Sequence, residues 1–167
     1  MSLSVSLRLS VEATQSSVGD LGMRTAPHKF DSGLLRLLDG IGYDQADLVF
    51  SDERTLGGSS EDLDLCGGFT DAFGTAVSPA KIKLVLIVNK SQTLALTAKP
   101  KASGGWLGML ADASDILNIN KASSQAYAWN AWFAPQGVAI GAGATDSITI
   151  GGTAGQIYQI LVIGTSA

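Results

Sequence analysis

The sequence contains one cysteine and no long apolar run, and each shortage excludes a class of protein. Cys66 alone cannot form a disulfide within the chain. A zinc or redox site would need further ligands that the sequence does not supply. We therefore expect Cys66, which precedes two glycines, to be a buried small apolar residue. No stretch reaches the length of a transmembrane helix, so no membrane association is expected.

Histidine is equally scarce, and the common catalytic motifs are missing. His28 is the only histidine, so the chain cannot build a His–metal–His site. A Ser-His-Asp set would need His28, but no Gly-x-Ser-x-Gly elbow is present to hold the nucleophile. The segment 141–146, "GAGATD", begins like a dinucleotide-binding loop, yet Asp146 stands where the third glycine belongs. We expect no enzyme activity, no cofactor and no metal.

Charged residues are few, and their balance is acidic. They make up 16% of the chain, below the usual quarter, and the formal net charge is −4. The field of the whole molecule repels phosphates, which argues against nucleic-acid binding. With 46% hydrophobic residues and 20 glycines, the composition favours a loop-rich β protein over a helical bundle. The N-terminal residues resemble no secretory leader, so we expect a soluble protein made in the cytoplasm.

Apolar residues alternate with polar ones over several short segments, which predicts strands. Residues 3–10 place four leucine or valine side chains on one face and serine or arginine on the other. From residue 46, strand patterns recur about every ten residues, which is typical of an all-β sandwich or barrel. The expected strands are 46–56, 60–65, 81–89, 93–98, 115–120, 126–134, 145–151 and 156–164. Two of them, 81–89 and 156–164, are apolar on both faces and should be central.

These patterns predict one all-β domain over residues 1–167, a single β-sandwich of jelly-roll type with an extended N-terminal arm. The sandwich core should span residues 46–164. Glycines and a proline interrupt residues 13–33, which we expect to be an irregular arm without a core of its own. Residues 34–40 fit either a helical turn or a strand.

Residues 50–65, "FSDERTLGGSSEDLDL", hold five carboxylates and are the main candidate for chemistry. Period two places Asp62 and Asp64 on one face of a strand and the leucines that alternate with them on the other. Asp52 and Arg54 share a face and can neutralise each other. A calcium loop that starts at Asp62 would need an oxygen ligand at its twelfth position, where Phe73 stands. We interpret the acids as solvated strand faces, with a glycosidase-type pair as the open alternative.

The aromatic segment 126–135, "AYAWNAWFAP", offers a contact site. If it is a strand, Trp129 and Phe133 share one face, which we expect to be the core, and Trp132 lies on the opposite face. An outward tryptophan is typical of a subunit interface or a sugar platform. We predict Trp132 as a partner contact and Trp106, in a glycine-rich segment, as a second one.

Four blocks together resemble a group of small virion proteins of tailed bacteriophages. They are "DGIGYDQADLVFSDERTL", "SSEDLDLCGGFTDAFG", "AKIKLVLIVNKS" and "TDSITIGGTAGQIYQILVIG". The resemblance covers about residues 39–99 and 141–164, and residues 100–137 depart from it. It implies a β-rich structural protein of the virion, most plausibly a capsid decoration (cement) protein, and it carries over no catalytic residue.

The resemblance also implies partners and a location. A decoration protein binds the major capsid protein or other virion subunits at the capsid surface, after synthesis in the bacterial host cytoplasm. Small proteins repeated on a symmetric lattice usually oligomerise, and we expect a homotrimer. The alternatives are a tail-associated protein, such as a fibre module, an adhesin module or a tail connector, and, more distantly, a carbohydrate-binding or carbohydrate-active β-sandwich.

Overall fold

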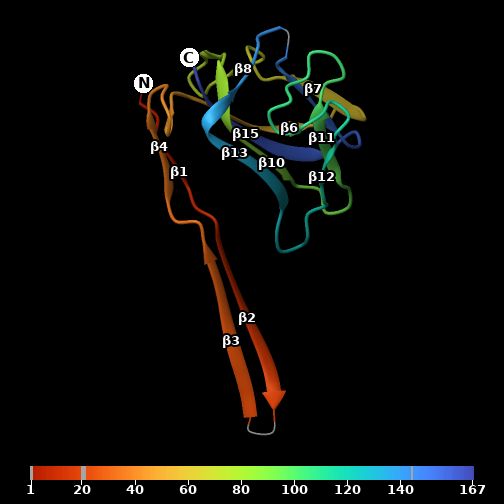
Figure 1. Cartoon of the computed structure of the whole chain (residues 1–167). Helices are drawn as coiled ribbons and strands as arrows, with labels where there is room; N and C mark the ends of the chain where they lie inside the picture. Colours follow the sequence, from red (N-terminus) through yellow and green to blue (C-terminus); the bar gives the residue numbers. More distant parts are fainter. Residues whose placement is uncertain (1, 20–21, 144) are drawn as a thin grey trace.

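Two four-stranded antiparallel sheets, packed face to face, form the body of the protein (Figure 1). The computed structural model describes residues 2–19, 22–143 and 145–167, and these residues form strands, turns and loops but no helix. Eight strands build the two sheets: β6 (Leu48–Thr55), β7 (Ser60–Asp64), β10 (Lys81–Asn89), β11 (Leu96–Pro100), β12 (Leu117–Ile119), β13 (Ala128–Ala139), β14 (Ser147–Gly151) and β15 (Ile157–Thr165).

The order of these strands is that of a jelly roll. The first sheet has the order β13-β10-β15-β6 and the second has the order β12-β11-β14-β7. Along the chain, successive strands alternate between the two sheets, except that β11 and β12 lie side by side in the second. Counted as strands one to eight, the sheets read 1-8-3-6 and 2-7-4-5, which is the arrangement of a jelly-roll sandwich. The predicted fold class is therefore confirmed.

The core lies between the sheets and is built by period-two alternation. In β7, Leu63 is buried and its neighbours Asp62 and Asp64 are exposed, as the sequence predicts. Both sheets contribute aliphatic side chains to one continuous cluster. Its members in the two four-stranded sheets are Phe50, Leu63, Ile82, Val85, Ile87, Leu96, Ala98, Ile119, Ile148, Ile150, Tyr158, Ile160 and Val162.

All eight strands expected from residue 46 onward are present, with ends shifted by a few residues. The two strands that are apolar on both faces, β10 and β15, are the two middle strands of the first sheet, as predicted. Their second apolar face is explained by a further layer. Leu84 of β10 and Ile163 of β15 point to the outer face of the sheet, where they pack against Leu37 and Ala46.

That further layer is a small N-terminal sheet. Strand β1 (Val5–Leu7) pairs antiparallel with β4 (Leu35–Asp39), and β4 pairs in parallel with β5 (Gln45–Ala46). Residues 34–40 therefore resolve as a strand rather than a helical turn. A separate short hairpin, β8 (Phe69–Thr70) with β9 (Ala76–Val77), adds Phe69 to the core, where it stacks on Phe50 with ring centroids 3.8 Å apart.

The segment predicted as irregular, residues 13–33, is mostly a long β-hairpin, so that prediction is wrong. Strands β2 (Ser10–Gly19) and β3 (Gly22–Asp31) pair over ten residues each and project away from the body (Figure 1). Pro27 is tolerated because the pair Thr14–Pro27 falls between hydrogen-bonded pairs of the ladder, so the missing N–H would have faced the open side of the strand. Residues 20 and 21, also part of the predicted arm, lie outside the described residues.

Candidate interaction surface

The exposed carboxylates of β7 are bound to neighbouring side chains. Asp62 accepts a hydrogen bond from the Thr149 hydroxyl at 2.6 Å and lies 3.3 Å from the Lys101 ammonium. The hydrogen bond from Thr149, followed by the ion pair with Lys101, lowers the pKa of Asp62. Asp64 accepts the backbone N–H of Cys66 at 2.8 Å and so shapes the turn after the strand. The solvated-face interpretation of these two acids is confirmed.

Glu61 differs from its neighbours because it points into the edge of the sandwich. Its carboxylate accepts bonds from Arg54, at 3.1 Å from Nη2, and from the buried hydroxyl of Tyr158. Arg54 also contacts Asp52 at 3.1 Å, which confirms that these two residues neutralise each other. Burial, together with the bond to Glu61, raises the pKa of Tyr158, so the phenol remains a neutral donor. This network closes the gap between strands β6 and β7 at the edges of the two sheets.

The fifth acid, Glu53, pairs with Lys90 at 2.7 Å and accepts a bond from Gln159 at 3.0 Å. Each of the five carboxylates thus has a protein partner. The described part of the chain contains no group of three or more His, Cys, Asp or Glu side chains placed to hold a metal ion. Within the same residues, no helix could span a membrane.

The two tryptophans predicted as exposed contacts lie inside, so the exposure prediction is wrong for both. Trp106 is only 2% exposed and donates its indole N–H to the carbonyl of Ala139 at 3.0 Å. A side chain at Gly108 would collide with the Trp106 ring, so this glycine provides the space in which the ring packs. Trp132 is partly buried against the core and meets Trp106 edge-on, with ring centroids 5.3 Å apart.

The register of residues 126–134 is therefore the opposite of the predicted one. Trp129 is 56% exposed and Phe133 lies on the outer face of the sheet, against the N-terminal layer. Tyr127 is also exposed and lies beside Lys90, whose ammonium is 5.4 Å from the ring centroid. Of the two tryptophans in this segment, Trp129 is the one that reaches the surface, although the alternation predicts a core position for it.

The outer face of the first sheet has a covered half and an open half. Pairing across the sheet places the outward side chains in rows. Phe133, Leu84, Ile163 and Val49 form the row under the N-terminal layer. The next two rows extend beyond that layer: Ala131, Leu86, Leu161 and Ser51, and then Trp129, Val88, Gln159 and Glu53. Leu86, Val88 and Leu161 are half-buried, and the other five are exposed. We call these two rows the open half of the sheet.

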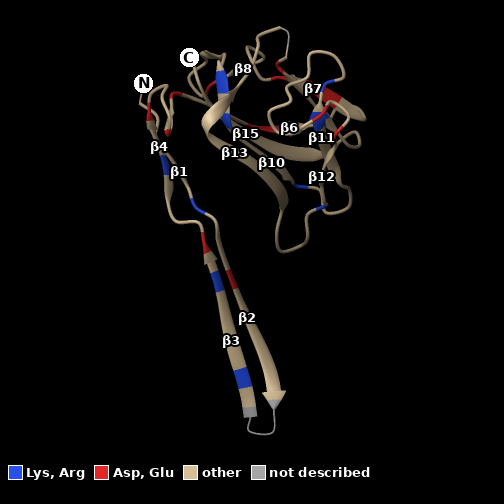
Figure 2. Ribbon diagram, in the orientation of Figure 1, with Lys and Arg blue, Asp and Glu red and all other residues tan. Residues whose placement is uncertain are grey.

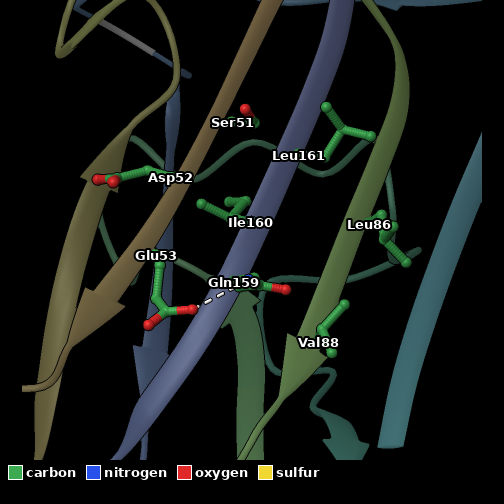
Figure 3. A pocket seen from close by; sticks show the side chains of 8 residues that line it. All are labelled: Ser51, Asp52, Glu53, Leu86, Val88, Gln159, Ile160 and Leu161. Carbon is green, nitrogen blue, oxygen red and sulfur yellow. Dashed lines mark hydrogen bonds between the residues drawn. The ribbon is translucent and has the colours of Figure 1, made fainter. Parts of the chain in front are cut away.

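The open half contains two adjoining grooves. One, of about 330 Å³, runs between β1 and the sheet and is almost entirely apolar, with Leu7, Leu86 and Trp129 among its lining residues. The other, of about 410 Å³, lies over β10, β15 and β6 and is more polar (Figure 3). Its lining side chains are Ser51, Asp52, Glu53, Leu86, Val88, Gln159, Ile160 and Leu161. The exposed Trp129 beside these grooves makes the open half a candidate contact site.

The open half ends at an unprotected strand. Strand β13 forms one edge of the first sheet and runs for twelve residues without a charged side chain (Figure 2). Long edge strands usually carry charges that prevent pairing with other chains, and the protection of β13 is limited to Pro135 and to a bulge in the ladder with β10. This edge is a second reason to expect that something covers the region.

The hairpin presents two apolar pairs on opposite faces. Val11 lies opposite Phe30 near its base, and Val18 lies opposite Met23 near its tip. Because side chains alternate along a strand, odd-numbered Val11 and even-numbered Val18 of β2 point to opposite sides. All four are exposed, by 85% at Val18 and 73% at Met23. No pattern in the sequence alone indicates these pairs, because they arise only when the two strands pair.

The described residues thus define a jelly-roll β-sandwich with a projecting hairpin and an apolar open half on one sheet. Comparison with models of protein families, with curated proteins and with solved structures finds no match to this chain.

Proposed function

We propose that this chain is a non-enzymatic structural protein of a bacteriophage particle, a decoration (cement) protein that binds the assembled capsid. The observation that carries the proposal is the β2–β3 hairpin, whose described side chains are all exposed. A two-stranded hairpin by itself is marginally stable in water. A long hairpin with an apolar pair at its tip is therefore suited to ordering against another surface, here the capsid shell.

The fold and the sequence resemblance support the same assignment. Jelly rolls serve as viral capsid domains, although lectins and cupins use the fold as well. A decoration protein that binds only the assembled shell stabilises it by mass action, and its hairpin would bridge neighbouring capsid subunits. In this arrangement the body supplies a rigid base and Val18 and Met23 supply the contact. The major capsid protein is the proposed partner, and a homotrimer is the proposed form.

Binding to capsids tests this function. Capsids assembled from the major capsid protein of the same genome, without other decoration, should carry the wild-type protein into the pellet on centrifugation. Replacing Val18 and Met23 with serine should weaken binding by about tenfold or more, since apolar anchors dominate interfaces. Replacing Ser16 and Thr25, a cross-strand pair on the same face, with alanine is the matched control and should leave binding unchanged. A wild-type protein that stays in the supernatant would overturn the proposal.

A tail-associated adhesin module that binds carbohydrate is the second candidate. Tyr127 and Trp129 are exposed aromatic rings. Gln159 and Glu53 lie in the row of Trp129, and Lys90 lies beside Tyr127, so the site combines ring faces with polar groups. A particle image by electron microscopy separates the candidates, because a decoration protein lies on the shell and an adhesin lies on the tail. Quenching of Trp129 fluorescence by soluble oligosaccharides would support the second candidate.

A further inference from the structure

The open half of the first sheet continues a surface that is already covered within the same chain. The neighbouring row, which includes Leu84 and Ile163, lies beneath the antiparallel pair β1–β4. The side chains that cover it, Leu3, Val5, Leu35 and Leu37, come from one face of this two-stranded ribbon. The β1–β4 pair, with Ala46 of β5 beside it, is thus the layer that packs on this face of the sheet. The open half begins where β1 ends, at Leu7.

The ribbon that covers the first row continues directly into the β2–β3 hairpin. Along the first strand, Leu9 and Val11 extend the alternating series of Leu3, Val5 and Leu7. Instead of lying on the open half, however, the hairpin leaves the body (Figure 1). The apolar face at its base, with Val11 and Phe30, remains 51% and 57% exposed at these two residues.

The hairpin of the same chain points away from the open half (Figure 1). Ser32 donates its N–H to the Leu9 carbonyl at 2.9 Å, and the Leu9 N–H is donated to the Ser32 hydroxyl at 3.0 Å. Arg8 forms an ion pair with Asp31 at the same point. These bonds add one pair to the β2–β3 ladder and keep the base of the hairpin closed. Because the hairpin of the same chain does not cover the open half, a ribbon from another molecule has room to lie there.

The base of the hairpin is chemically suited to this place. Its Val11 face also carries Ala13 and Ala26 among its described residues, and the open half offers leucine, valine and Trp129. The charged side chain described on that face is Arg24, and none of its described residues is a carboxylate. Glu53 lies at the rim of the open half, and the chain as a whole is acidic. Because the described residues of the Val11 face include no carboxylate, its approach meets no repulsion between carboxylates.

We propose that the base of the β2–β3 hairpin of one copy packs on the open half of the first sheet of a second copy. The length of the hairpin, about 33 Å at 3.3 Å per residue, allows its base to cover the sheet while the tip extends beyond it. Contacts made in this head-to-tail way form a ring, such as a trimer, when the rotation between copies closes, and a mutual exchange of hairpins forms a symmetric dimer. This association does not depend on the proposed function and can be measured without a capsid.

Light scattering of the purified full chain, with serine variants, tests the association. Wild-type protein at about 100 µM should have the mass of a closed dimer or trimer, since a specific interface of this kind has a dissociation constant well below that concentration. Phe30→Ser and Trp129→Ser should each raise the dissociation constant by about tenfold or more. Val18→Ser, on the opposite face of the hairpin, is the matched control and should leave the mass unchanged. A monomeric wild type, or an oligomer that both variants retain, would overturn the proposal.

Cross-linking gives an independent measure that does not rely on loss of binding. With Cys66 replaced by serine, Val11→Cys and Ala131→Cys in one chain should form disulfides between copies on mild oxidation. Val18→Cys with Ala131→Cys should not, because residue 18 points away. If the protein is monomeric and Trp129 becomes protected from acrylamide only on adding capsids or an oligosaccharide, the shell or a sugar covers this face, and the proposal is wrong.

Discussion

The sandwich body and the N-terminal hairpin are both antiparallel β structure, yet different forces hold them. In the body, each strand has one face in a core to which both sheets contribute, and Leu63, Leu96 and Ile150 are fully enclosed. In the hairpin, the same backbone pairing carries exposed side chains throughout its described length. Hydrogen bonding alone adds little net free energy in water, and burial supplies most of it. The body therefore has a core of its own, whereas the described residues of the hairpin have none.

The first way to test this comparison is to remove the same kind of side chain from each region. Leu63→Ala should lower the free energy of unfolding by about 2–5 kcal/mol, since it leaves a cavity in the core. Val11→Ala in the hairpin, measured at a protein concentration low enough to avoid association, should change it by less than about 0.5 kcal/mol. Urea unfolding followed by circular dichroism measures both. Equal losses would show that the hairpin belongs to the cooperative core.

Within the body, the two tryptophans of β13 allow the same comparison between a packed and an exposed side chain. Trp132→Ala should cost about 3 kcal/mol of stability, because the ring packs on the core and on Trp106. Trp129→Ala should change the stability of the monomer by less than about 1 kcal/mol, because its ring lies on the surface. Thermal melts of dilute samples give both values. A larger loss of stability for Trp129→Ala than for Trp132→Ala would instead support the register predicted from the sequence, with Trp129 in the core.

A small effect is also expected from the exposed acids. Asp62→Asn with Asp64→Asn should change stability at pH 7 by no more than about 1 kcal/mol, since exposed ion pairs contribute little. The pKa of Asp62 is lower in the folded protein, so its contribution is complete above the ordinary value of 3.8 and is lost as the pH falls through the folded pKa. The difference between variant and wild type should therefore vanish in strong acid.

The same acids allow a direct check for a metal. Calcium or EDTA should leave the melting temperature of the wild type unchanged, because Asp62 and Asp64 already have protein partners. A drop of several degrees with EDTA that calcium reverses would contradict the solvated-face interpretation.

Much of the body was predictable because each strand is half-buried. Alternation placed Leu63 and Leu65 inside and Asp62 and Asp64 outside, and the spacing of turns gave all eight strands. The inner face of β13 was not predictable in the same way, because aromatic residues occupy both of its faces. Trp132 packs on the main core, and Phe133 packs under the N-terminal layer. Period two shows that two faces exist, but it does not show which layer covers each one.

The hairpin and the open half escaped prediction for a different physical reason. The glycines and Pro27 suppress a strand pattern locally, and the pairing of β2 with β3 depends on cross-strand bonds that the alternation of side chains does not reveal. The open half consists of residues from β6, β10, β13 and β15, which only the fold brings together. The apolar second face of β10 was the one sequence signal for the open half. It indicated that β10 lies in the middle of a sheet, but not that two rows of its outer face remain uncovered.

Removal of the hairpin most directly tests whether the body folds by itself. Leu9 and Ser32 are already joined by backbone hydrogen bonding, so residues 10–31 can be replaced by a short Gly-Ser turn without moving either end. We predict that the shortened chain is a soluble β protein. It should unfold cooperatively in urea, with a midpoint that does not depend on protein concentration. An unfolded chain, or a broad transition without cooperativity, would contradict the claim that the body folds by itself and the hairpin serves its partners.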